Sequence, residues 1–475
     1  MNYQHVKLQV ESDEFLPKGT DILLSIPLIT AFSLTSERRI RLSFGKASYL
    51  VRFQPTSQTF PYIRIKESVA QELLLPDSFF EICCQYNSAE KTLTIGPLLA
   101  ILSSSDIESK DLNKEKPFGE LNSYFQEFVQ AAKEKHSIGY VVTLNELKQE
   151  ETVKGWIYQN GNWISKTFPL PDIMYNRISS RKIERKEETK NKINYLKNKD
   201  VSFFNDKFLD KWSIHEGLMQ DPEISPLLPH TAKYYNQDSL RFFLQKHSYI
   251  YLKPVHGSMG SGIVRIEKDR DYCCQYTSMN GFITNRYSTF HKLFEKIYPK
   301  LNKRQYIMQQ GLHLMTINKE ILDFRALVQK DQRGEWNIIS IVARVSNEKN
   351  IVSNIARGGT IYPLTEALNS LDIPLPVVST RRKIKETSLK VAKSLEQYLP
   401  GEYAELGIDL ALDTRGNLWL IEVNSKPSKT TASLSKGTAE NKVRRSVVKL
   451  MDYCFYRSGF IHLFQHPSRR RSKKG

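Results

Sequence analysis

The sequence lacks the features of a membrane protein and of a disulfide-stabilised protein. Among its 475 residues, no apolar run approaches the roughly 18 residues that a membrane-spanning helix needs. The start of the chain has neither the basic region nor the apolar stretch of a secretion signal. We therefore expect a cytoplasmic protein with no membrane partner. The cysteines are odd in number, show no CxxC spacing and should be reduced and mostly buried: Cys83, Cys84, Cys273, Cys274 and Cys454.

Acidic residues are too few to balance the basic ones, and the 69 Lys+Arg against 51 Asp+Glu give a net charge of +18. The basic residues concentrate in Arg177–Lys199, where glutamates alternate with them, and in the tail Arg469–Lys474. A solvated helix and a frayed terminus account for both stretches better than a nucleic-acid site does. We therefore do not expect nucleic acid as a partner.

The apolar pattern divides the chain into three domains and a tail. Residues 40–53 alternate apolar and polar side chains, which indicates strands, whereas the polar stretch after Ser103 is typical of a linker. A helical period over 121–132 is followed by the apolar run Ile138–Val142, which indicates an α/β unit. From residue 206 strands and helices alternate. The predicted parts are a β-rich domain 1–105, a small α/β domain 118–205, an α/β (α+β) domain 206–465 and a basic disordered tail 466–475.

Several shorter elements follow from local signals. Asn160-Gly161 between aromatic and β-branched arms predicts a hairpin within residues 155–164. In the third domain the predicted strands are 249–253, 262–266, 305–310, 324–329, 336–345, 406–413 and 417–423.

A glycine-rich loop follows the predicted strand 249–253. Three glycines in six positions, 257–262, allow backbone N–H groups to surround an anion, and Lys253 supplies a charge for phosphate oxygens. The spacing of the glycines matches neither the Walker nor the Rossmann pattern. In addition, a strand follows the loop, whereas a helix follows those two patterns. A glycine-rich hairpin with a surface lysine would have the same pattern.

Two carboxylates and an amide mark the last predicted pair of strands. The turn Asp413–Gly416 joins them, so Asp409 faces the strand that carries Glu422 and Asn424. Glu422 and Asn424 should share a face with Leu420. Such an oxygen-only set suits Mg²⁺. We expect the two carboxylates to repel each other when no metal is bound. An exposed edge with ordinary charges is the alternative.

The order of these motifs resembles the ATP-grasp superfamily over roughly residues 206–430. The carrying motifs are Lys-Pro-x-x-Gly-x-x-Gly-x-Gly from Lys253, Asp-Phe-Arg from Asp323, Asn-x-x-Arg-Gly-Gly from Asn354, and Gly-Ile-Asp followed by Glu-Val-Asn-x-x-Pro. Asp210–His215, Leu228–Thr231 and the last motif resemble more narrowly the YheC/YheD family of endospore coat-associated proteins of bacilli. The resemblance implies an ATP-grasp fold preceded by a pre-ATP-grasp α/β domain and the N-terminal β-rich domain.

The resemblance also implies a role for individual residues. Arg325 would stabilise charge on the transferred phosphate, and Asn354 with Arg357 would line the acceptor side. Gln310 stands where many relatives have Glu. Mg²⁺, or Mn²⁺ in its place, would be held by Asp409, Glu422 and Asn424. The residues that would bind ATP are Lys211, Lys253, Gly257, Ser258, Gly260, Ser261, Gly262, Gln309, Gln310 and Leu312.

Three functions compete at this point. The first is an ATP- and Mg²⁺-dependent ligase that joins a carboxylate to an amine or thiol through an acyl phosphate, associated with the spore coat. The second is an ATP-binding assembly protein of the coat without turnover, with coat proteins as partners. It gives no physical reason to keep three metal ligands together. The third, a nucleic-acid binder, depends on net charge alone.

Overall fold

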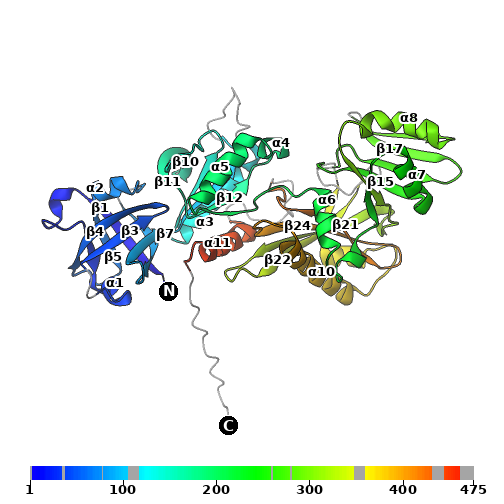
Figure 1. The fold of residues 1–475 in the computed structure, drawn as a ribbon. Helices are drawn as coiled ribbons and strands as arrows, with labels where there is room; N and C mark the ends of the chain where they lie inside the picture. Colours follow the sequence, from blue (N-terminus) through cyan, green and yellow to red (C-terminus); the bar gives the residue numbers. More distant parts are fainter. Residues whose placement is uncertain are drawn as a thin grey trace, which may run out of the picture. The chain divides into compact units, whose positions relative to one another are not determined.

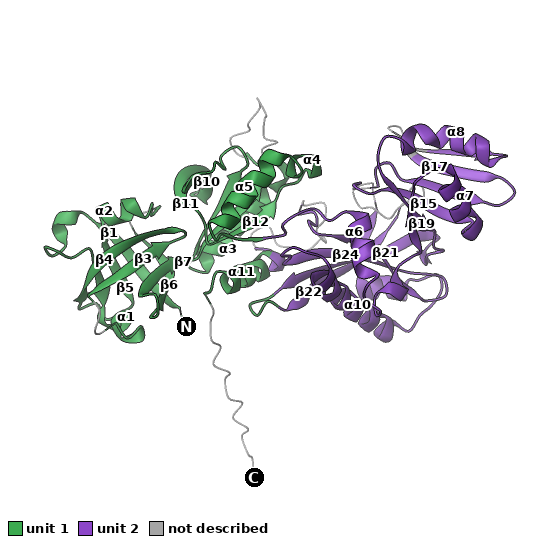
Figure 2. Cartoon of the chain, viewed as in Figure 1, with its two compact units in different colours: residues 1–203, 331–334, 447–475 green, residues 204–330, 335–446 purple. Residues whose placement is uncertain are grey.

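A computed structural model describes residues 3–34, 38–76, 79–104, 117–257, 260–278, 281–346, 359–429 and 443–460. The chain divides into two compact units (Figure 2). The first contains residues 1–203 with 331–334 and 447–475, and the second contains 204–330 and 335–446. In the part of the chain that is described, no helix is long and apolar enough to cross a membrane.

The first unit begins with a closed β-barrel, in which every strand is paired on both sides. The alternation over residues 40–53 places Ile40, Leu42 and Val51 in the barrel core, whereas Arg39 and Arg41 are exposed. Around the barrel the strands are β1 (Gln4–Glu11), β5 (Tyr62–Lys66), β2 (Ile22–Ser25), β4 (Ala47–Thr56), β3 (Arg39–Phe44), β7 (Thr92–Gly96) and β6 (Phe79–Asn87). Its helices are η1 (Asp13–Phe15), α1 (Ile26–Ala31) and α2 (Glu67–Glu72).

A six-stranded sheet with helices completes the first unit. The predicted hairpin is confirmed: Asn160 and Gly161 both have positive φ, 52° and 81°, which this two-residue turn requires. The strand order is β11 (Asn162–Pro169), β10 (Thr152–Gln159), β9 (Ile138–Thr143), β8 (Leu98–Ser103), β12 (Ile173–Arg177) and β13 (Ser202–Phe204). The helices are η2 (Gly119–Leu121), α3 (Asn122–Glu134), α4 (Arg181–Glu184), α5 (Glu187–Asn198) and α11 (Arg445–Arg457).

Two boundaries of the expected domains differ from the structure. Strand β8 lies within the range 1–105 but pairs in parallel with β9 and β12, and all its residues are buried. A continuously apolar run suits a strand covered on both faces rather than a barrel strand. Residues from Val447 onward, expected in the domain 206–465, belong to the first unit. Helical periodicity shows that α11 buries one face but not which element covers it. The tail 466–475 lies outside the described residues.

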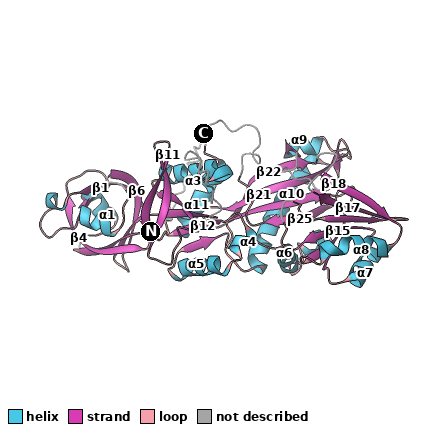
Figure 3. Cartoon of the chain, turned by 90° about the horizontal axis from the view of Figure 1, so that it is seen from above, coloured by secondary structure: helices cyan, strands magenta, loops and turns pink. Residues whose placement is uncertain are grey.

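The second unit contains a sheet covered by two helices on one face. Helices α7 (Gln237–Lys246) and α8 (Phe290–Leu301) form a core with Ile250, Leu252 and Ile266 of the sheet, and Figure 3 shows both helices beside β15 and β17. The strand order is β14 (Thr231–Lys233), β19 (Tyr306–Gln310), β15 (Tyr249–Pro254), β16 (Val264–Lys268), β17 (Tyr272–Ser278) and β18 (Gly281–Tyr287). Strands β17 and β18 were not among the predicted ones.

The other sheet of this unit packs against the long helix α10 (Val377–Tyr398), whose Ile384, Val391 and Leu395 enter its core (Figure 1). The strand order is β23 (Thr360–Pro363), β22 (Trp336–Val345), β21 (Glu320–Lys330), β24 (Glu405–Leu412) and β25 (Leu418–Asn424), and β20 (Thr316–Ile317) pairs with β21. The remaining helices are α6 (Lys211–Leu218), η3 (Ser225–Leu227) and α9 (Leu364–Asn369).

One buried asparagine holds together the ends of two neighbouring strands of this sheet, β24 and β25. The side-chain amide of Asn205 donates to the carbonyl oxygens of Glu405, at 2.8 Å, and of Ser425. Its oxygen accepts from the backbone N–H groups of Ala404 and Glu405 at 3.0 and 3.3 Å. Its φ of 52° lies in the left-handed region that asparagine tolerates. These bonds hold the start of β24 and the end of β25 together, beside the predicted metal ligands.

Candidate functional site

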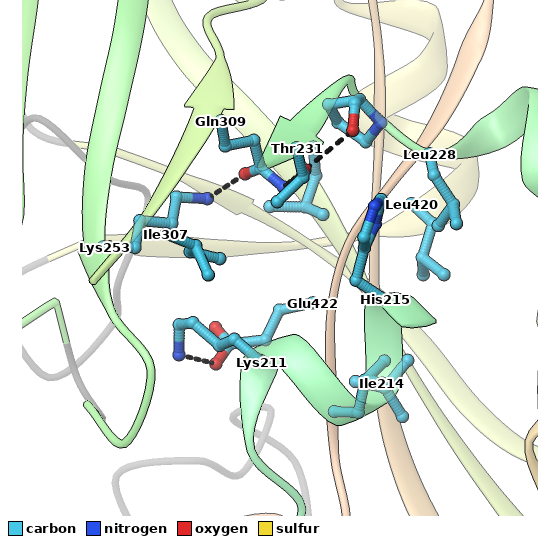
Figure 4. A pocket seen from close by; sticks show the side chains of 13 residues that line it. Lys211, Ile214, His215, Leu228, Thr231, Lys253, Ile307, Gln309, Leu420 and Glu422 are labelled. Carbon is cyan, nitrogen blue, oxygen red and sulfur yellow. Dashed lines mark hydrogen bonds and ion pairs between the residues drawn. The ribbon is translucent and has the colours of Figure 1, made fainter. Parts of the chain in front are cut away.

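A pocket in the second unit lies between its two sheets (Figure 4). Helix α6 contributes Lys211 and His215, which are four residues apart and therefore share a helix face. Apolar side chains and charged side chains both contribute to the lining. The lining residues are Lys211, Ile214, His215, Leu228, Pro229, Thr231, Lys253, Ile307, Gln309, Leu420, Ile421, Glu422 and Val423.

Lys253 points into this pocket from β15. Its ammonium group donates to the side-chain oxygen of Gln309, whose amide in turn donates to Thr231 at 3.1 Å (Figure 4). Burial lowers the pKa of Lys253 from its ordinary value to about 8, against the opposing effect of Glu422. Burial disfavours the charged form of this ammonium group. An anionic ligand bound next to it would stabilise that charge, so the position favours an anion.

Lys211 is the first residue of α6, where the side chain of Asp210 caps the helix by accepting from two backbone N–H groups. Its ammonium donates to Glu422 at 2.8 Å and to the carbonyl oxygen of Gly257 at 3.0 Å. Burial on its own raises the pKa of Glu422, but Lys211 and Lys253 more than offset this effect, so the net shift is downward. Glu422 is therefore ionised at neutral pH.

A row of alternating charges crosses four strands beside the pocket. Arg344 of β22 donates to both oxygens of Asp323 on β21, at 2.6 Å each. Arg325, also on β21, forms a bidentate ion pair with Asp409 of β24. Arg344 reaches the same carboxylate at 3.2 Å. Asp409 is the cross-strand partner of Glu422 on β25, so strand register alone brings these groups together.

The two arginines keep Asp409 ionised. Burial raises the pKa of Asp409, but Arg325 and Arg344 lower it by more, so the pKa lies below its ordinary value. For Arg344, burial lowers the pKa, whereas Asp409 and Asp323 raise it well above the ordinary value. The expected repulsion is present, because Asp409 raises the pKa of Glu422, but it is outweighed: each carboxylate is paired with a cation of its own, and the net shift of both pKa values is downward.

A β-bulge changes one further expectation. Asp409 pairs with Glu422, but the next residue, Leu410, pairs with Leu420, so Ile421 is the extra residue. Neighbouring residues of β24 point to opposite faces, and their partners do too. Leu420 therefore lies on the face opposite Glu422, in the core with α10, and not on the shared face that we predicted.

The oxygen donors predicted to hold a metal share one face of this sheet. Asp409 and Glu422 are paired, and Asn424 lies opposite Gly407, two residues farther along. Two ionised carboxylates and an amide are hard ligands that fit Mg²⁺. The described residues contain no group of three or more His, Cys, Asp or Glu placed to hold a metal ion. Because Arg325 engages both oxygens of Asp409, Glu422 is the more accessible carboxylate.

The glycine loop lies next to Lys211 through its contact with Gly257. Gly260 and Gly262 have φ of 70° and 74°, values that favour glycine. The carbonyl oxygen of Gly262 accepts from Tyr306 at 3.1 Å. Ser261 is described between these glycines, whereas Ser258 lies outside the described residues.

Of the residues after Tyr306 that were predicted to bind ATP, Gln309 lines the pocket, whereas Gln310 and Leu312 are not among the lining residues. The backbone N–H of Gln310 donates to His230 of the adjacent segment at 2.8 Å, which ties β19 to β14. Asn354 and Arg357, predicted for the acceptor side, lie outside the described residues, so the structure does not place them.

Comparisons with known proteins agree with this geometry. A family model described as YheC/D-like ATP-grasp matches residues 200–456. The chain belongs to the YheC/D-like ATP-grasp family. Endospore coat-associated protein YheD of Bacillus subtilis is 26% identical over 78% of this chain and 81% of its own length. Endospore coat-associated protein YheC of the same organism is 23% identical over 64% of this chain and 84% of its own.

A solved structure, the VanG D-Ala:D-Ser ligase from Enterococcus faecalis, is 11% identical and has a TM-score of 0.44 over 77% of this chain and 97% of its own. The α/β ATP-grasp fold predicted from the motifs is confirmed by the family match and by the mixed sheets described above.

Sequence reasoning missed several residues of this ATP-grasp site. His215 could have been found from its spacing to Lys211, because positions i and i+4 face the same way on a helix. Burial lowers its pKa, so its ring is neutral at neutral pH. Arg344 gave no recognisable signal, since its contact with Asp323 of the Asp-Phe-Arg motif depends on the register between β21 and β22 and on the irregularity after Leu327.

We predict that Asp409→Asn destabilises the protein in the absence of nucleotide by about 3 kcal/mol, because it leaves the Arg325 guanidinium without its buried counter-charge and Arg344 with Asp323 alone. Glu422→Gln should cost only about 1 kcal/mol, because it removes one ion pair from a side chain that is 31% exposed, against 5% for Asp409. Urea unfolding followed by circular dichroism measures both. Equal stability of Asp409→Asn and the parent protein would contradict the charge row.

Proposed function

We propose that this chain is an ATP-dependent ligase of the ATP-grasp type, which joins a carboxylate to an amine or thiol through an acyl phosphate and requires Mg²⁺ or Mn²⁺. One observation carries the proposal. Lys211, Lys253 and Glu422 line one pocket between two sheets, and Glu422 is paired across strands with the ionised Asp409. Lysines for phosphate and hard oxygen ligands for a metal are the groups that phosphoryl transfer needs.

The pocket has distinct charged and apolar parts. Lys211 and Lys253 would bind the phosphates, and the glycine loop after β15 would supply backbone donors to them. The base would lie against the apolar lining, formed by Ile214, Leu228 and Ile307. Gln309 lines the same pocket and holds Lys253, so it would orient this lysine toward the phosphates. These residues bind and position the nucleotide but take no part in bond making.

Asp409, Glu422 and Asn424 would hold the metal. When bound, the metal offsets negative charge on the phosphates and polarises the group that is transferred. Glu422 would have to leave Lys211, which then becomes available for a phosphate oxygen. Asp409 would likewise have to release one or both of its bonds from Arg325. The carboxylates of this sheet could thus bind a cation while Lys211 and Arg325 bind a polyphosphate.

Arg325 would stabilise the reacting phosphate. A carboxylate of the substrate attacks the γ-phosphate, ADP leaves, and an acyl phosphate forms; the amine or thiol then attacks the acyl carbon and inorganic phosphate leaves. Negative charge develops on the phosphoryl oxygens in the first step, and a guanidinium group released from Asp409 would offset it. We propose Asn354 and Arg357 for the acceptor side on the strength of their motif.

The relatives support a place of action. Both Bacillus subtilis proteins are named endospore coat-associated, and this chain spans more than four fifths of each. We propose that the chain acts in the cytoplasm in association with the spore coat, with coat proteins as partners. An ATP-binding assembly role without turnover is the second function that this association would fit.

ADP release separates the two functions. We expect purified protein with ATP and Mg²⁺ to release ADP when it is given a suitable carboxylate and amine from a screen of amino acids, peptides and cell-wall precursors, with the joined product seen by mass spectrometry. Lys253→Met should lower kcat/KM at least about 100-fold, because the phosphates lose a partly desolvated charge. Lys383→Met, at an exposed position on α10, serves as the control. ATP binding without ADP release across the screen would favour the assembly role.

We also predict that ATP affinity falls above pH 8. Free Lys253 has a pKa of about 8, and bound phosphates would raise it, so the complex holds more protons than the free protein above that pH. Affinity should be nearly constant below pH 7, fall about twofold by pH 8 and fall roughly fivefold more between pH 8 and 9. Calorimetry at fixed Mg²⁺ measures this. Lys253→Arg should give a flat profile, because guanidinium stays charged; the same pH profile in both proteins would contradict the assignment.

A further inference from the structure

A second concave surface lies in the same unit and plays no part in the proposed reaction. It has a cavity volume of about 690 Å³ and lies between the start of α7 and the end of α8. We call it the α7–α8 groove. Its lining residues are Tyr234, Tyr235, Asn236, Gln237, Phe294, Tyr298, Leu301, Asn302, Lys303, Arg304 and Gln305.

The groove lies on the helix-covered face of the sheet, away from Lys253. Tyr306 and Lys253 occupy opposite faces: Tyr306 pairs with Pro254 and packs in the core with α7 and α8, whereas Lys253 is directed into the nucleotide pocket. Side chains alternate between the faces of a strand, so a ligand in the groove does not occupy the pocket. The groove therefore lies on the other face of the sheet from Lys253, although the guanidinium group of Arg304 also lies beside Gly262 of the glycine loop.

The composition of the groove is that of a protein interface. Tyr235 is 74% exposed and Tyr298 is 46% exposed, although aromatic side chains of this size usually bury most of their surface. Aromatic residues and arginine are enriched in the centres of protein interfaces. Most of the polar lining residues are also exposed. A small ligand would remain largely in water here, whereas small-molecule sites bury most of their ligand. An extended polypeptide segment fits this openness better.

The charge of the groove selects the kind of segment. The lining contains Lys303 and Arg304 and no carboxylate. Within the described part of the chain, neither cation has an ion-pair partner within 4 Å, so both retain their charge for a ligand. An acidic segment complements this surface, and a basic one is repelled.

We propose that the α7–α8 groove docks an acidic, aromatic-containing polypeptide segment of a partner protein, independently of ATP. Tyr235 and Tyr298 supply the apolar contacts, and Lys303 with Arg304 supply the charge. Neither the carboxylates nor the lysines of the nucleotide pocket take part, so the proposal does not depend on ligase activity.

The test uses the full chain and a fluorescein-labelled 15-residue peptide of alternating Glu and Tyr, with a Lys/Tyr peptide of equal length as a probe of the opposite charge. Fluorescence anisotropy without nucleotide should show binding of the acidic peptide alone. The charge-reversed Lys303→Glu/Arg304→Glu variant should weaken it at least tenfold, and Tyr235→Ala/Tyr298→Ala should weaken it similarly. The matched control reverses Arg381 and Arg382, two adjacent exposed cations on α10 outside the groove.

The melting temperature of each variant reports whether the fold is intact. Absence of acidic-peptide binding to the parent protein would overturn the proposal, as would equal losses in the groove and α10 charge variants. A single-stranded oligonucleotide of the same net charge serves as a further probe. If it binds the groove as tightly as the peptide does, the groove is a general polyanion surface and the proposal is overturned. Self-association that is abolished by the groove variants would instead make a second copy of this chain the occupant.

Discussion

The ion pair between Arg325 and Asp409 is the interaction on which the candidate site depends. Asp409 lies in the middle of a sheet, on a strand whose residues are all buried. A carboxylate in that position would become protonated unless cations compensated it, and a protonated carboxyl group is a poor ligand for Mg²⁺. Arg325 and Arg344 supply the compensation. The site thus keeps its negative charge without a bound metal.

This arrangement has a consequence for how the site is used. Each anion of the row has a cation of the chain as its partner, so a bound metal and a polyphosphate would exchange partners rather than introduce unbalanced charge. Lys211 would pass from Glu422 to phosphate, and Arg325 would pass from Asp409 to phosphate. Gly407 supports this geometry: a side chain there would come within 3.2 Å of the Arg325 guanidinium, so the glycine leaves room for that group. Preorganised charge of this kind lowers the cost of rearrangement on binding.

Much of this site could be predicted from the sequence because local signals determine it. The turn Asp413–Gly416 set the pairing of β24 with β25, and that pairing brought Asp409 next to Glu422. Long-range features could not be predicted in this way. Arg344 contacts Asp409 across an irregular strand pair, and the bulge at Ile421 moved Leu420 to the other face. Neither irregularity leaves a recognisable pattern in apolar periodicity.

The same division holds for the fold. Short apolar runs located seven strands of the second unit, namely β15, β16, β19, β21, β22, β24 and β25, but not β14, β17, β18, β20 or β23. The sequence did not show that β8 joins the second sheet or that α11 packs in the first unit, because apolar content predicts that an element is buried without naming its neighbour.

A crystal structure with Mg²⁺ and a non-hydrolysable ATP analogue tests the central claim most directly. The account predicts the metal on oxygens of Glu422 and Asp409, Lys253 on the phosphates, and Arg325 released from at least one oxygen of Asp409. It also predicts Arg344 still paired with Asp323. A nucleotide bound in the pocket while Arg325 keeps both bonds to Asp409 and the metal avoids both carboxylates would contradict the account.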